Sequence, residues 1–218
     1  MRAIGFESVK KSYDTDQGPV FDGLDLDISE GEFILLTGKS GSGKSTVLKL
    51  ILKETEPDGG RITVNGKDIS GIGPKDVPEY RRNIGMIFQD FRLFRDYSVY
   101  ENLEMVYIMT GGRKKEAEKK ITDTLTMLGI DHLHKRRPDE LSGGETQKIC
   151  MARALMTNPV ILLADEPTGN LDPVSSGEII KLMELIHRHG TTVVMATHDL
   201  DTVSLLENSA RRIDLGGL

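Results

Sequence analysis

The sequence predicts an α/β fold, in which a parallel sheet core carries an antiparallel sub-domain and a helical one. Four apolar runs have the pattern of strands covered on both faces, at residues 33–37, 84–88, 160–164 and 192–196. Shorter alternating runs lie near the N-terminus, and the stretch after them contains helical patterns without a convincing strand. We therefore expect one domain over residues 1–218, with an N-terminal antiparallel β sub-domain and an inserted helical sub-domain at about 91–158.

The antiparallel sub-domain is predicted from three runs, at residues 2–9, 20–28 and 61–64. Turn-forming residues separate them, because Asp, Gly and Pro gather at 16–19 and again at 57–60. Runs of this length joined by such turns are typical of antiparallel strands. The first part of the chain should therefore form a sheet beside the parallel core.

Helices are expected between the core strands, at residues 44–53, 113–128, 144–156 and 175–189. The clearest is 113–128, because its apolar residues fall on one face, opposite lysines and glutamates. These apolar residues are Ala117, Ile121, Leu125 and Leu128. They should pack against the core.

Composition limits the classes of function. With 218 residues, 38% of them hydrophobic, the chain is long enough for one full-sized core. Its formal net charge of −6 provides no overall positive field for nucleic acid or anionic lipid. Cys150 is the only cysteine, which excludes an intramolecular disulfide and a zinc site built on several thiolates. We expect it to be a small buried residue on a helix.

The sequence shows no pattern of a membrane span or a signal peptide. No apolar stretch approaches the ~18 residues that a span needs, and the first residues lack a continuous apolar run. We expect a soluble, cytosolic chain that serves a membrane only through a partner.

Three basic clusters raise the question of nucleic acid, at Lys114-Lys115, Lys119-Lys120 and residues 135–137. No aromatic residues interleave with them, the net charge is negative, and Glu116 and Lys120 are expected to pair along a helix. We therefore predict a solvated face and no nucleic-acid partner. An alternative for 135–137 is contact with anionic headgroups when a partner holds the protein at a membrane.

The strongest motif is a glycine-rich loop between the run at 33–37 and the helix expected at 44–53. It fits the pattern G-x-x-x-x-G-K-[ST], whose glycines let backbone N–H groups converge on phosphates, and the helix adds its free N-terminal donors. Lys44 should contact the β- and γ-phosphates, and the Ser45 hydroxyl should complete a Mg²⁺ shell. The predicted binding residues are Gly38, Lys39, Ser40, Gly41, Ser42, Gly43, Lys44, Ser45 and Thr46.

Two acids, Asp165 and Glu166, follow the apolar run at 160–164. They would lie at the carboxyl end of a strand, where open α/β sheets bind ligands. Asp165 is expected to hold Mg²⁺ through water, and Glu166 to polarise or deprotonate the attacking water. The alternative is a strand that merely ends in acids before the turn at Pro167.

A second candidate anion site begins the helix expected at 144–156, with Ser142, Gly143, Gly144 and Glu145. A helix start offers free N–H groups and here a hydroxyl. The alternative is an ordinary helix start, for which such residues are common. Because one nucleotide needs only one cradle, a second site suggests that ATP is held between two subunits.

In this order the motifs resemble the ATP-binding-cassette family of ATPases, over nearly the whole chain. The resemblance implies a P-loop NTPase (RecA-like) core, Mg²⁺-dependent hydrolysis of ATP to ADP and phosphate, and a homodimer with ATP at its interface. Residues 141–145 match the signature motif of the family, which contacts the γ-phosphate of ATP on the opposite subunit. The family commonly continues with Gln-Gln-Arg, whereas this chain has Thr146, Gln147 and Lys148. A lysine lacks the planar donor pair of arginine, so contacts there should be looser.

The resemblance also implies roles for four further residues. Gln89 matches the glutamine that senses Mg²⁺ and water. The implied catalytic residues are therefore Lys44, Gln89, Glu166 and His198. The implied metal ligands are Ser45, Gln89 and Asp165. His198 matches the histidine that holds the γ-phosphate and positions Glu166. Asp172 matches the loop that crosses the dimer interface, and Tyr13 sits where the family stacks a ring on adenine. From the residues alone, a solvated glutamine, a capping histidine and a packed tyrosine remain alternatives.

Within the family, residues 77–90, 96–102 and 162–172 resemble the bacterial cell-division ATPases. That resemblance implies an integral membrane subunit as partner and a peripheral location on the cytoplasmic face of the inner membrane. Phe91, Leu93 and Phe94 would then contact the partner, or alternatively pack within the helical sub-domain.

Other functions remain open at this stage. The motif at 162–172 is shared with ATPases of lipoprotein-release and macrolide-export systems. A soluble family member that acts on nucleic acid is a further alternative, although such proteins usually carry long coiled-coil insertions. A last alternative is a module that uses ATP only to assemble.

Overall fold

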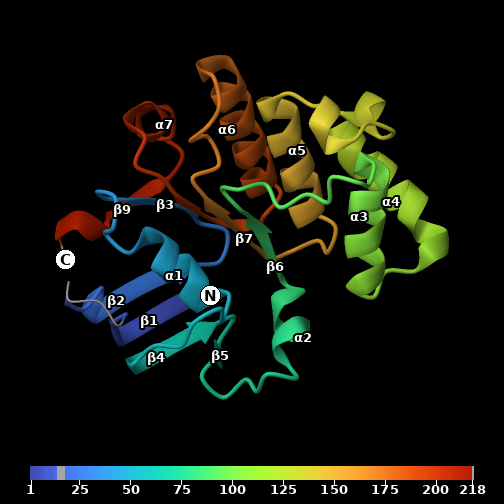
Figure 1. The fold of residues 1–218 in the computed structure, drawn as a ribbon. Coiled ribbons are helices and arrows are strands. Elements are labelled where there is room, and N and C mark those ends of the chain that lie inside the picture. The colour runs from blue at the N-terminus through green and yellow to red at the C-terminus, as the bar shows by residue number, and fades with distance from the viewer. Residues whose placement is uncertain (14–17, 218) are drawn as a thin grey trace.

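The computed structural model describes residues 1–13 and 18–217, so positions 16 and 17 of the predicted turn at 16–19 lie outside the described residues. Its centre is a parallel sheet (Figure 1). The strands, in spatial order, are β6 (Ile84–Ile87), β7 (Ile161–Asp165), β8 (Thr192–Ala196), β3 (Phe33–Thr37) and β9 (Arg211–Asp214). The four predicted core strands are confirmed with shifts of at most one residue, and β9 joins them at the edge beside β3.

Both faces of the inner strands β7, β8 and β3 are covered, which explains their nearly continuous apolar runs. Ile34 and Leu36 of β3 pack in one hydrophobic cluster, whereas Phe33 and Leu35 pack in another. Strands β7 and β8 divide their residues between the same two clusters. Successive side chains of a strand point to opposite faces, so a strand with two covered faces needs a continuous apolar run.

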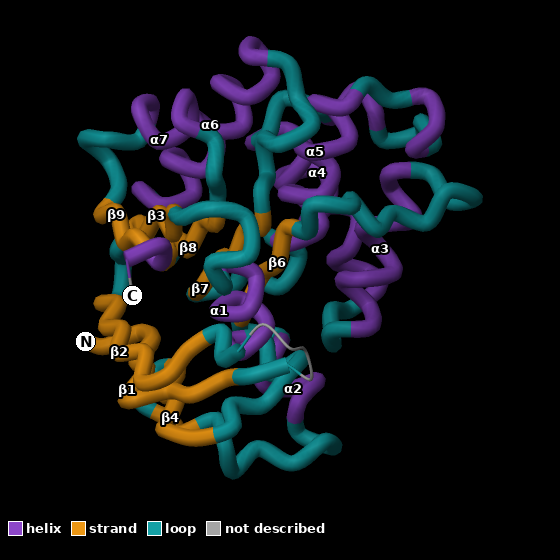
Figure 2. Tube along the Cα trace, turned by 60° about the vertical axis from the view of Figure 1, so that its left-hand side comes forward, coloured by secondary structure: helices purple, strands orange, loops and turns teal. Residues whose placement is uncertain are grey.

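The antiparallel sub-domain forms a second sheet, as predicted. Its strands, in spatial order, are β2 (Phe21–Ser29), β1 (Arg2–Lys11), β4 (Gly59–Val64) and β5 (Lys67–Asp68). Helix α1 (Lys44–Ile51) lies between the two sheets (Figures 1 and 2), and its apolar side chains belong to the cluster that joins them. This position anchors the loop that precedes α1 on both sheets.

The opposite face of the parallel sheet is covered by longer helices. Helices α5 (Gly143–Ala154) and α6 (Pro173–Arg188) contact the strands, and α3 (Val99–Met109) and α4 (Lys114–Met127) pack beside α5. The predicted apolar face of α4 is buried, with Ala117, Ile121 and Leu125 at 1% exposure or less. In the described chain, residues 91–158 contain helices and turns but no strand, including 3₁₀ turns at Asp131–Leu133 and Pro138–Glu140. The boundaries of a helical sub-domain there remain a prediction.

Several short elements were not predicted. They are α2 (Val77–Arg81), α7 (Leu200–Leu205), β5, β9 and a 3₁₀ turn at Leu215–Gly217. Strand β9 has the sequence Arg-Arg-Ile-Asp, and it is an edge strand whose side chains are mostly exposed. Neither periodicity nor an apolar run marks such a segment.

The expected pairing of Glu116 with Lys120 is wrong. Glu116 pairs instead with Arg113 at 3.2 Å, and the Lys120 ammonium donates to the Asn158 side-chain oxygen at 2.5 Å. Burial lowers the pKa of Lys120, against the attraction of Asp123, so this lysine is not simply solvated. The other lysines and arginines of the three basic clusters are exposed, as expected for a solvated face.

Two expectations about the whole chain can be compared with the described residues. Among these residues, no helix combines the length and the apolar character needed to cross a bilayer. Cys150 is fully buried on α5, and burial raises the pKa of its thiol to about 11. The prediction of a small buried residue is confirmed.

Candidate functional site

The glycine-rich loop joins β3 to α1 and has a backbone that only glycines adopt easily. Gly41 and Gly43 have φ values of 83° and 93°, in the left-handed region. A Cβ atom on Gly43 would lie 2.5 Å from the Phe21 ring, so the close approach to β2 also requires glycine. As N-cap of α1, Gly43 offers no side-chain acceptor to the first N–H groups of the helix. Those donors therefore face the loop, where an anion can bind.

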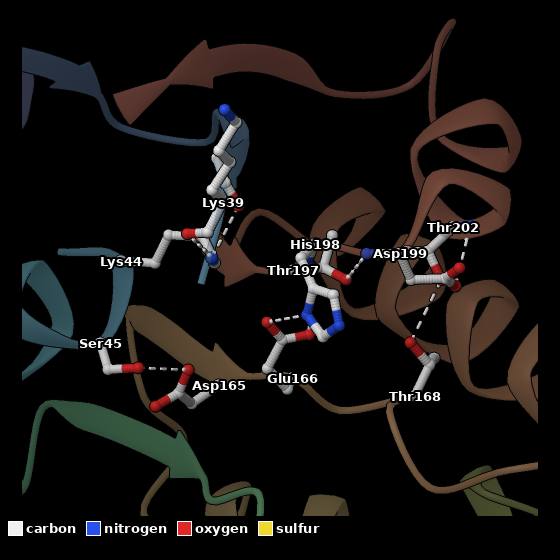
Figure 3. Close-up of polar contacts among 11 residues, drawn as sticks. Lys39, Lys44, Ser45, Asp165, Glu166, Thr168, Thr197, His198, Asp199 and Thr202 are labelled. Atoms are coloured by element: carbon white, nitrogen blue, oxygen red, sulfur yellow. Dashed lines mark hydrogen bonds and ion pairs between the residues drawn. The ribbon is translucent and has the colours of Figure 1, made fainter. Parts of the chain in front are cut away.

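Lys44 is the buried cation of this loop, with 7% of its surface exposed. Its ammonium donates to the carbonyl oxygens of Gly38 at 2.9 Å and Lys39 at 3.1 Å (Figure 3). Both partners are neutral, so they orient the charge without neutralising it. An ammonium has three hydrogens, and the third remains for an anion.

Ser45 and Asp165 meet where α1 faces the end of β7. The Ser45 hydroxyl donates to Asp165 Oδ1 at 3.0 Å (Figure 3), and Gln89 joins both residues in lining a pocket of about 360 Å³. Burial raises the pKa of the Asp165 carboxyl, although the Ser45 hydroxyl opposes that effect. A hydroxyl, a carboxylate and an amide oxygen are the hard donors that Mg²⁺ prefers, so the residues fit this ion.

Glu166 and His198 form a pair across the ends of β7 and β8. His198 Nδ1 lies 2.7 Å from Glu166 Oε1, and the His198 backbone N–H donates to Glu166 Oε2 at 3.4 Å. The side chain of Glu166 is 10% exposed and that of His198 is 62% exposed. Glu166 has φ 47°, an unusual backbone conformation for a glutamate. The Glu166 carboxylate is thus held in place by two contacts with His198.

A shared pocket places this pair near the loop. His198 and Thr197 line a pocket of about 590 Å³ together with Gly38, Lys39 and Ser40. The structure therefore brings together the predicted residues Lys44, Ser45, Gln89, Asp165, Glu166 and His198 at the carboxyl edge of the parallel sheet.

The second candidate anion site is a helix cap in this chain. Glu145 N–H donates to Ser142 Oγ at 3.3 Å, and Ser142 N–H donates to Glu145 Oε2 at 2.8 Å. The Ser142 hydroxyl and N–H lower the pKa of the Glu145 carboxyl. Asp172 likewise caps α6 by accepting from the N–H groups of Val174 and Ser175, both at 3.0 Å. These hydrogen bonds stay within the helix starts and do not reach the loop at 38–46.

Tyr13 lies beside the start of α1. Its ring is 40% exposed, its hydroxyl is 3.5 Å from Thr46 Oγ1, and the Lys11 ammonium lies 5.3 Å from the ring centroid. An exposed ring next to the loop is compatible with stacking on a base, which remains a prediction. Of the apolar residues after Gln89, Phe91 and Leu93 pack against the helical core, whereas Phe94 is 54% exposed.

Sequence reasoning missed two polar groups around the site. The first consists of Thr168, Thr197, Asp199 and Thr202, which are linked by hydrogen bonds beside Glu166 and His198 (Figure 3). The second is Arg153, whose guanidinium donates to the carbonyl oxygens of Phe91 and Arg92, two residues with left-handed backbones. Only the acid and hydroxyl of Asp199 and Thr202, spaced as in a helix cap, could have been recognised from the sequence.

Comparisons with known proteins agree with this geometry. A family model described as ABC transporter matches residues 21–169. The cell division ATP-binding protein FtsE of Mycobacterium tuberculosis (strain ATCC 25618 / H37Rv) is 40% identical over 99% of this chain and 94% of that protein. FtsE of Bacillus subtilis (strain 168) is 39% identical over 98% and 93%. A dimeric post-hydrolysis structure of the ATP-binding cassette MJ0796, bound to ADP and Pi, matches with a TM-score of 0.86 and 31% identity, covering 98% of this chain and 95% of that one.

Proposed function

The chain belongs to the ABC transporter family of ATPases, and on that premise we propose that it is the nucleotide-binding subunit of a membrane-bound complex of the FtsE type. It binds and hydrolyses ATP. The observation that carries the proposal is the pairing of Ser45 with Asp165 and of Glu166 with His198 at one edge of the sheet. A metal-binding pair beside a water-activating pair is the arrangement that phosphoryl transfer to water requires.

Glu166 is proposed as the general base. A water molecule attacks the γ-phosphorus, the bond to the bridging oxygen breaks, and ADP leaves while Glu166 accepts the proton of the water. Lys44 stabilises the charge on the phosphate oxygens, and His198 holds the Glu166 carboxylate through the 2.7 Å contact. General-base catalysis of this kind contributes typically ~10²–10⁴-fold, and the electrostatic contribution of Lys44 adds to it.

Ser45, Asp165 and Gln89 would hold Mg²⁺. All three residues line one pocket beside the loop, and their donor types suit this ion. When bound, the ion would neutralise part of the charge of the phosphates. Tyr13 is proposed to stack on the adenine, because its exposed ring lies next to Thr46.

We further propose that two copies close head to tail around two ATP molecules. Ser142, Gly144 and Asp172 of one copy would complete the site of the other. Ser142 and Gly143 are exposed at the start of α5, so a second chain can reach them. The solved ATP-binding cassette that resembles this chain is itself dimeric and holds ADP and Pi. In this arrangement residues 1–218 act as one ATPase domain, with the signature motif carried by a helical sub-domain at about 91–158.

The partner is proposed to be an integral membrane subunit of the FtsX type. ATP-driven closure would be transmitted through it to control cell-wall hydrolysis in division, with the chain peripheral on the cytoplasmic face of the inner membrane. The relatives named as cell division proteins support this role. The exposed rings of Phe94 and Tyr97, which follow Gln89 in the sequence, lie 5.8 Å apart between centroids and offer an apolar contact.

The variant Glu166→Gln tests the ATPase site. It should bind ATP, fail to turn it over and accumulate closed dimers, measured by phosphate release and by size-exclusion chromatography with light scattering. Glu118→Gln, an exposed glutamate on α4, is the matched control and should behave as the natural chain does. A Glu166→Gln protein that still hydrolyses ATP at the normal rate would refute the proposed role.

The partner is tested by purifying the native membrane complex. Co-purification of an FtsX-like subunit supports the cell-division role. Co-purification of a lipoprotein-release or macrolide-export subunit instead would overturn that role and leave the ATPase intact.

A further inference from the structure

The imidazole of His198 is not held in place by packing. Its side chain is 62% exposed, so no surrounding core holds the imidazole against Glu166. A mobile ring would lose the alignment that the 2.7 Å contact shows. The orientation must therefore come from the backbone on either side of His198 and from whatever anchors that backbone.

On the N-terminal side, Thr197 anchors the backbone to the sheet. Its N–H donates to the Leu36 carbonyl of β3 at 3.0 Å, and its hydroxyl accepts from the Asp199 N–H at 3.1 Å. Thr197 is fully buried. Asp199 is thus hydrogen-bonded to Thr197, and the tight turn between them places the His198 imidazole at its tip.

On the C-terminal side, the anchor is a chain of hydroxyl groups that leads back to Glu166. Thr202 Oγ1 donates to Asp199 Oδ2 at 2.6 Å and lies 3.1 Å from Thr168 Oγ1 (Figure 3). A hydroxyl has one hydrogen, and that of Thr202 is used on the carboxylate. The Thr168 hydroxyl must therefore donate to Thr202. Thr168 and Thr202 are 4% and 1% exposed, so water does not replace either partner.

We propose that Thr168, Thr202 and Asp199 are positioning residues for hydrolysis, because they close a ring beside the Glu166–His198 pair. The ring runs from Glu166 along the backbone to Thr168, across two hydrogen bonds to Asp199, along the backbone to His198, and back to Glu166. Hydrogen bonds in such a chain polarise and strengthen one another, most of all when it ends on a carboxylate. The inference rests on the proposed roles of Glu166 and His198.

The test compares three variants in steady-state ATP hydrolysis. Thr202→Val keeps the shape of the side chain but breaks the ring, and should lower kcat about tenfold or more while KM for ATP changes by less than about twofold. Thr202→Ser restores the hydroxyl and should recover most of kcat. Thr124→Val is the control, because Thr124 is also buried, at 5% exposure, and its variant loses only a bond to the Lys120 carbonyl. It should leave kcat unchanged.

A second readout does not depend on turnover. An ionised carboxylate only accepts, so the Glu166 contact places the proton of a neutral His198 ring on Nδ1. In ¹⁵N spectra of the free protein, assigned with His198→Gln, Thr202→Val should shift His198 toward the Nε2–H form. Thr124→Val should not. This measurement tests whether the hydrogen-bonded ring orients His198, and it does so even if Glu166→Gln shows that Glu166 is not the general base.

Thr168→Val removes the other partner of the Thr168–Thr202 hydrogen bond, and it serves as the test if Thr202→Val folds poorly. It should reproduce the loss of kcat, and the double variant should be no worse than either single one, because all three break the same link. A normal kcat and an unchanged His198 tautomer in Thr168→Val or Thr202→Val would overturn the proposal. So would losses that add in the double variant.

Discussion

Helices α1 and α5 were both expected to bind phosphate at their N-termini, and the structure shows that they begin in opposite ways. Helix α1 starts at Gly43, which has no side-chain acceptor for the first N–H groups, and Lys44 brings a positive charge to the same turn. Helix α5 starts at Ser142, and the Glu145 carboxylate already accepts a hydrogen bond there. The N-terminus of α1 is therefore open to an anion, whereas the N-terminus of α5 is already capped by the Glu145 carboxylate.

Helix α3 supplies a reference for this comparison. Its cap, Ser98 with Glu101, has the same hydrogen bonds as the cap of α5, including a serine hydroxyl that donates to the glutamate at 2.7 Å in both. Among the described residues, Ser98 lines neither of the two pockets beside the loop at 38–46. Cap geometry alone thus does not distinguish a structural helix start from a signature motif, and paired variants of α3 and α5 separate the two roles.

The largest effect is expected at the open terminus. Lys44→Met removes the buried cation but keeps most of its volume, and should lower the rate of ATP hydrolysis by about 10²-fold or more, because a charge stabiliser in the transition state is lost. Steady-state phosphate release and calorimetric ATP binding measure it. Lys115→Met, an exposed lysine on α4, is the control. Normal turnover in Lys44→Met would remove the functional distinction between the two termini.

The next effect is on stability and compares two glycines. Gly43→Ala forces an alanine to φ 93° and places its Cβ 2.5 Å from Phe21. The left-handed conformation alone costs about 1–2 kcal/mol, so the free energy of unfolding should fall by at least that much. At the start of α5, Gly143→Ala would place Cβ 3.3 Å from Leu171, and helix propensity favours alanine.

Denaturant titration of both glycine variants gives the measurement. Gly143→Ala should change the free energy of unfolding by less than about 1 kcal/mol in either direction. Equal losses in the two variants would mean that the backbone of the α1 loop is no more constrained than the start of α5.

What the sequence could predict differs between these regions for a physical reason. The loop at 38–46 and the four core strands were predicted nearly residue by residue, because a local pattern determines each of them. The cap of α5 was also visible, but its meaning was not, since α3 carries the same chemistry. Only the order of motifs along the chain favoured a role in binding.

Contacts between distant residues could not be predicted. The Thr168–Thr202 bond joins residues 34 positions apart, and neither threonine differs in the sequence from a threonine that merely packs. The left-handed backbone of Glu166 is likewise imposed by its surroundings, because its N–H bonds to the Ala196 carbonyl of β8 at 2.9 Å. The expected Glu116–Lys120 pair is wrong for the same reason, because Lys120 bonds to Asn158, which is 38 positions away in the sequence.

The third prediction uses the matched caps of α5 and α3. Ser142→Ala and Ser98→Ala should each cost about 1 kcal/mol of stability, because each removes the same N-cap hydrogen bond. Only Ser142→Ala should also reduce nucleotide-dependent dimerisation and hydrolysis. Thermal unfolding measures the first effect, and light scattering with phosphate release measures the second. Equal activity of the two variants would show that Ser142 is a cap and nothing more.

The smallest effect concerns the carboxylate that occupies the start of α5. The pKa of Glu145 is lowered in the folded chain, first by the Ser142 hydroxyl and then by the Ser142 N–H, and Ser98 lowers that of Glu101 in the same way. A lowered pKa means that the charged form stabilises the fold at pH values above the ordinary pKa, and that this contribution disappears as the pH falls through the folded value. The Tm difference between the natural chain and Glu145→Gln should therefore be present at pH 7 and vanish in acid.

Glu101→Gln should show the same pH dependence of Tm, but the two variants should differ in dimerisation. If the start of α5 meets the γ-phosphate of a second copy, the Glu145 charge repels it, and the repulsion is weakened by solvent and salt. Glu145→Gln should then strengthen ATP-dependent dimerisation about twofold, an effect of ~0.4 kcal/mol that high salt reduces. Glu101→Gln should leave dimerisation unchanged. Identical dimer affinities of Glu145→Gln and Glu101→Gln at low salt would mean that the Glu145 carboxylate is far from the ATP of the second copy. The N-terminus of α5 would then act only as a helix start.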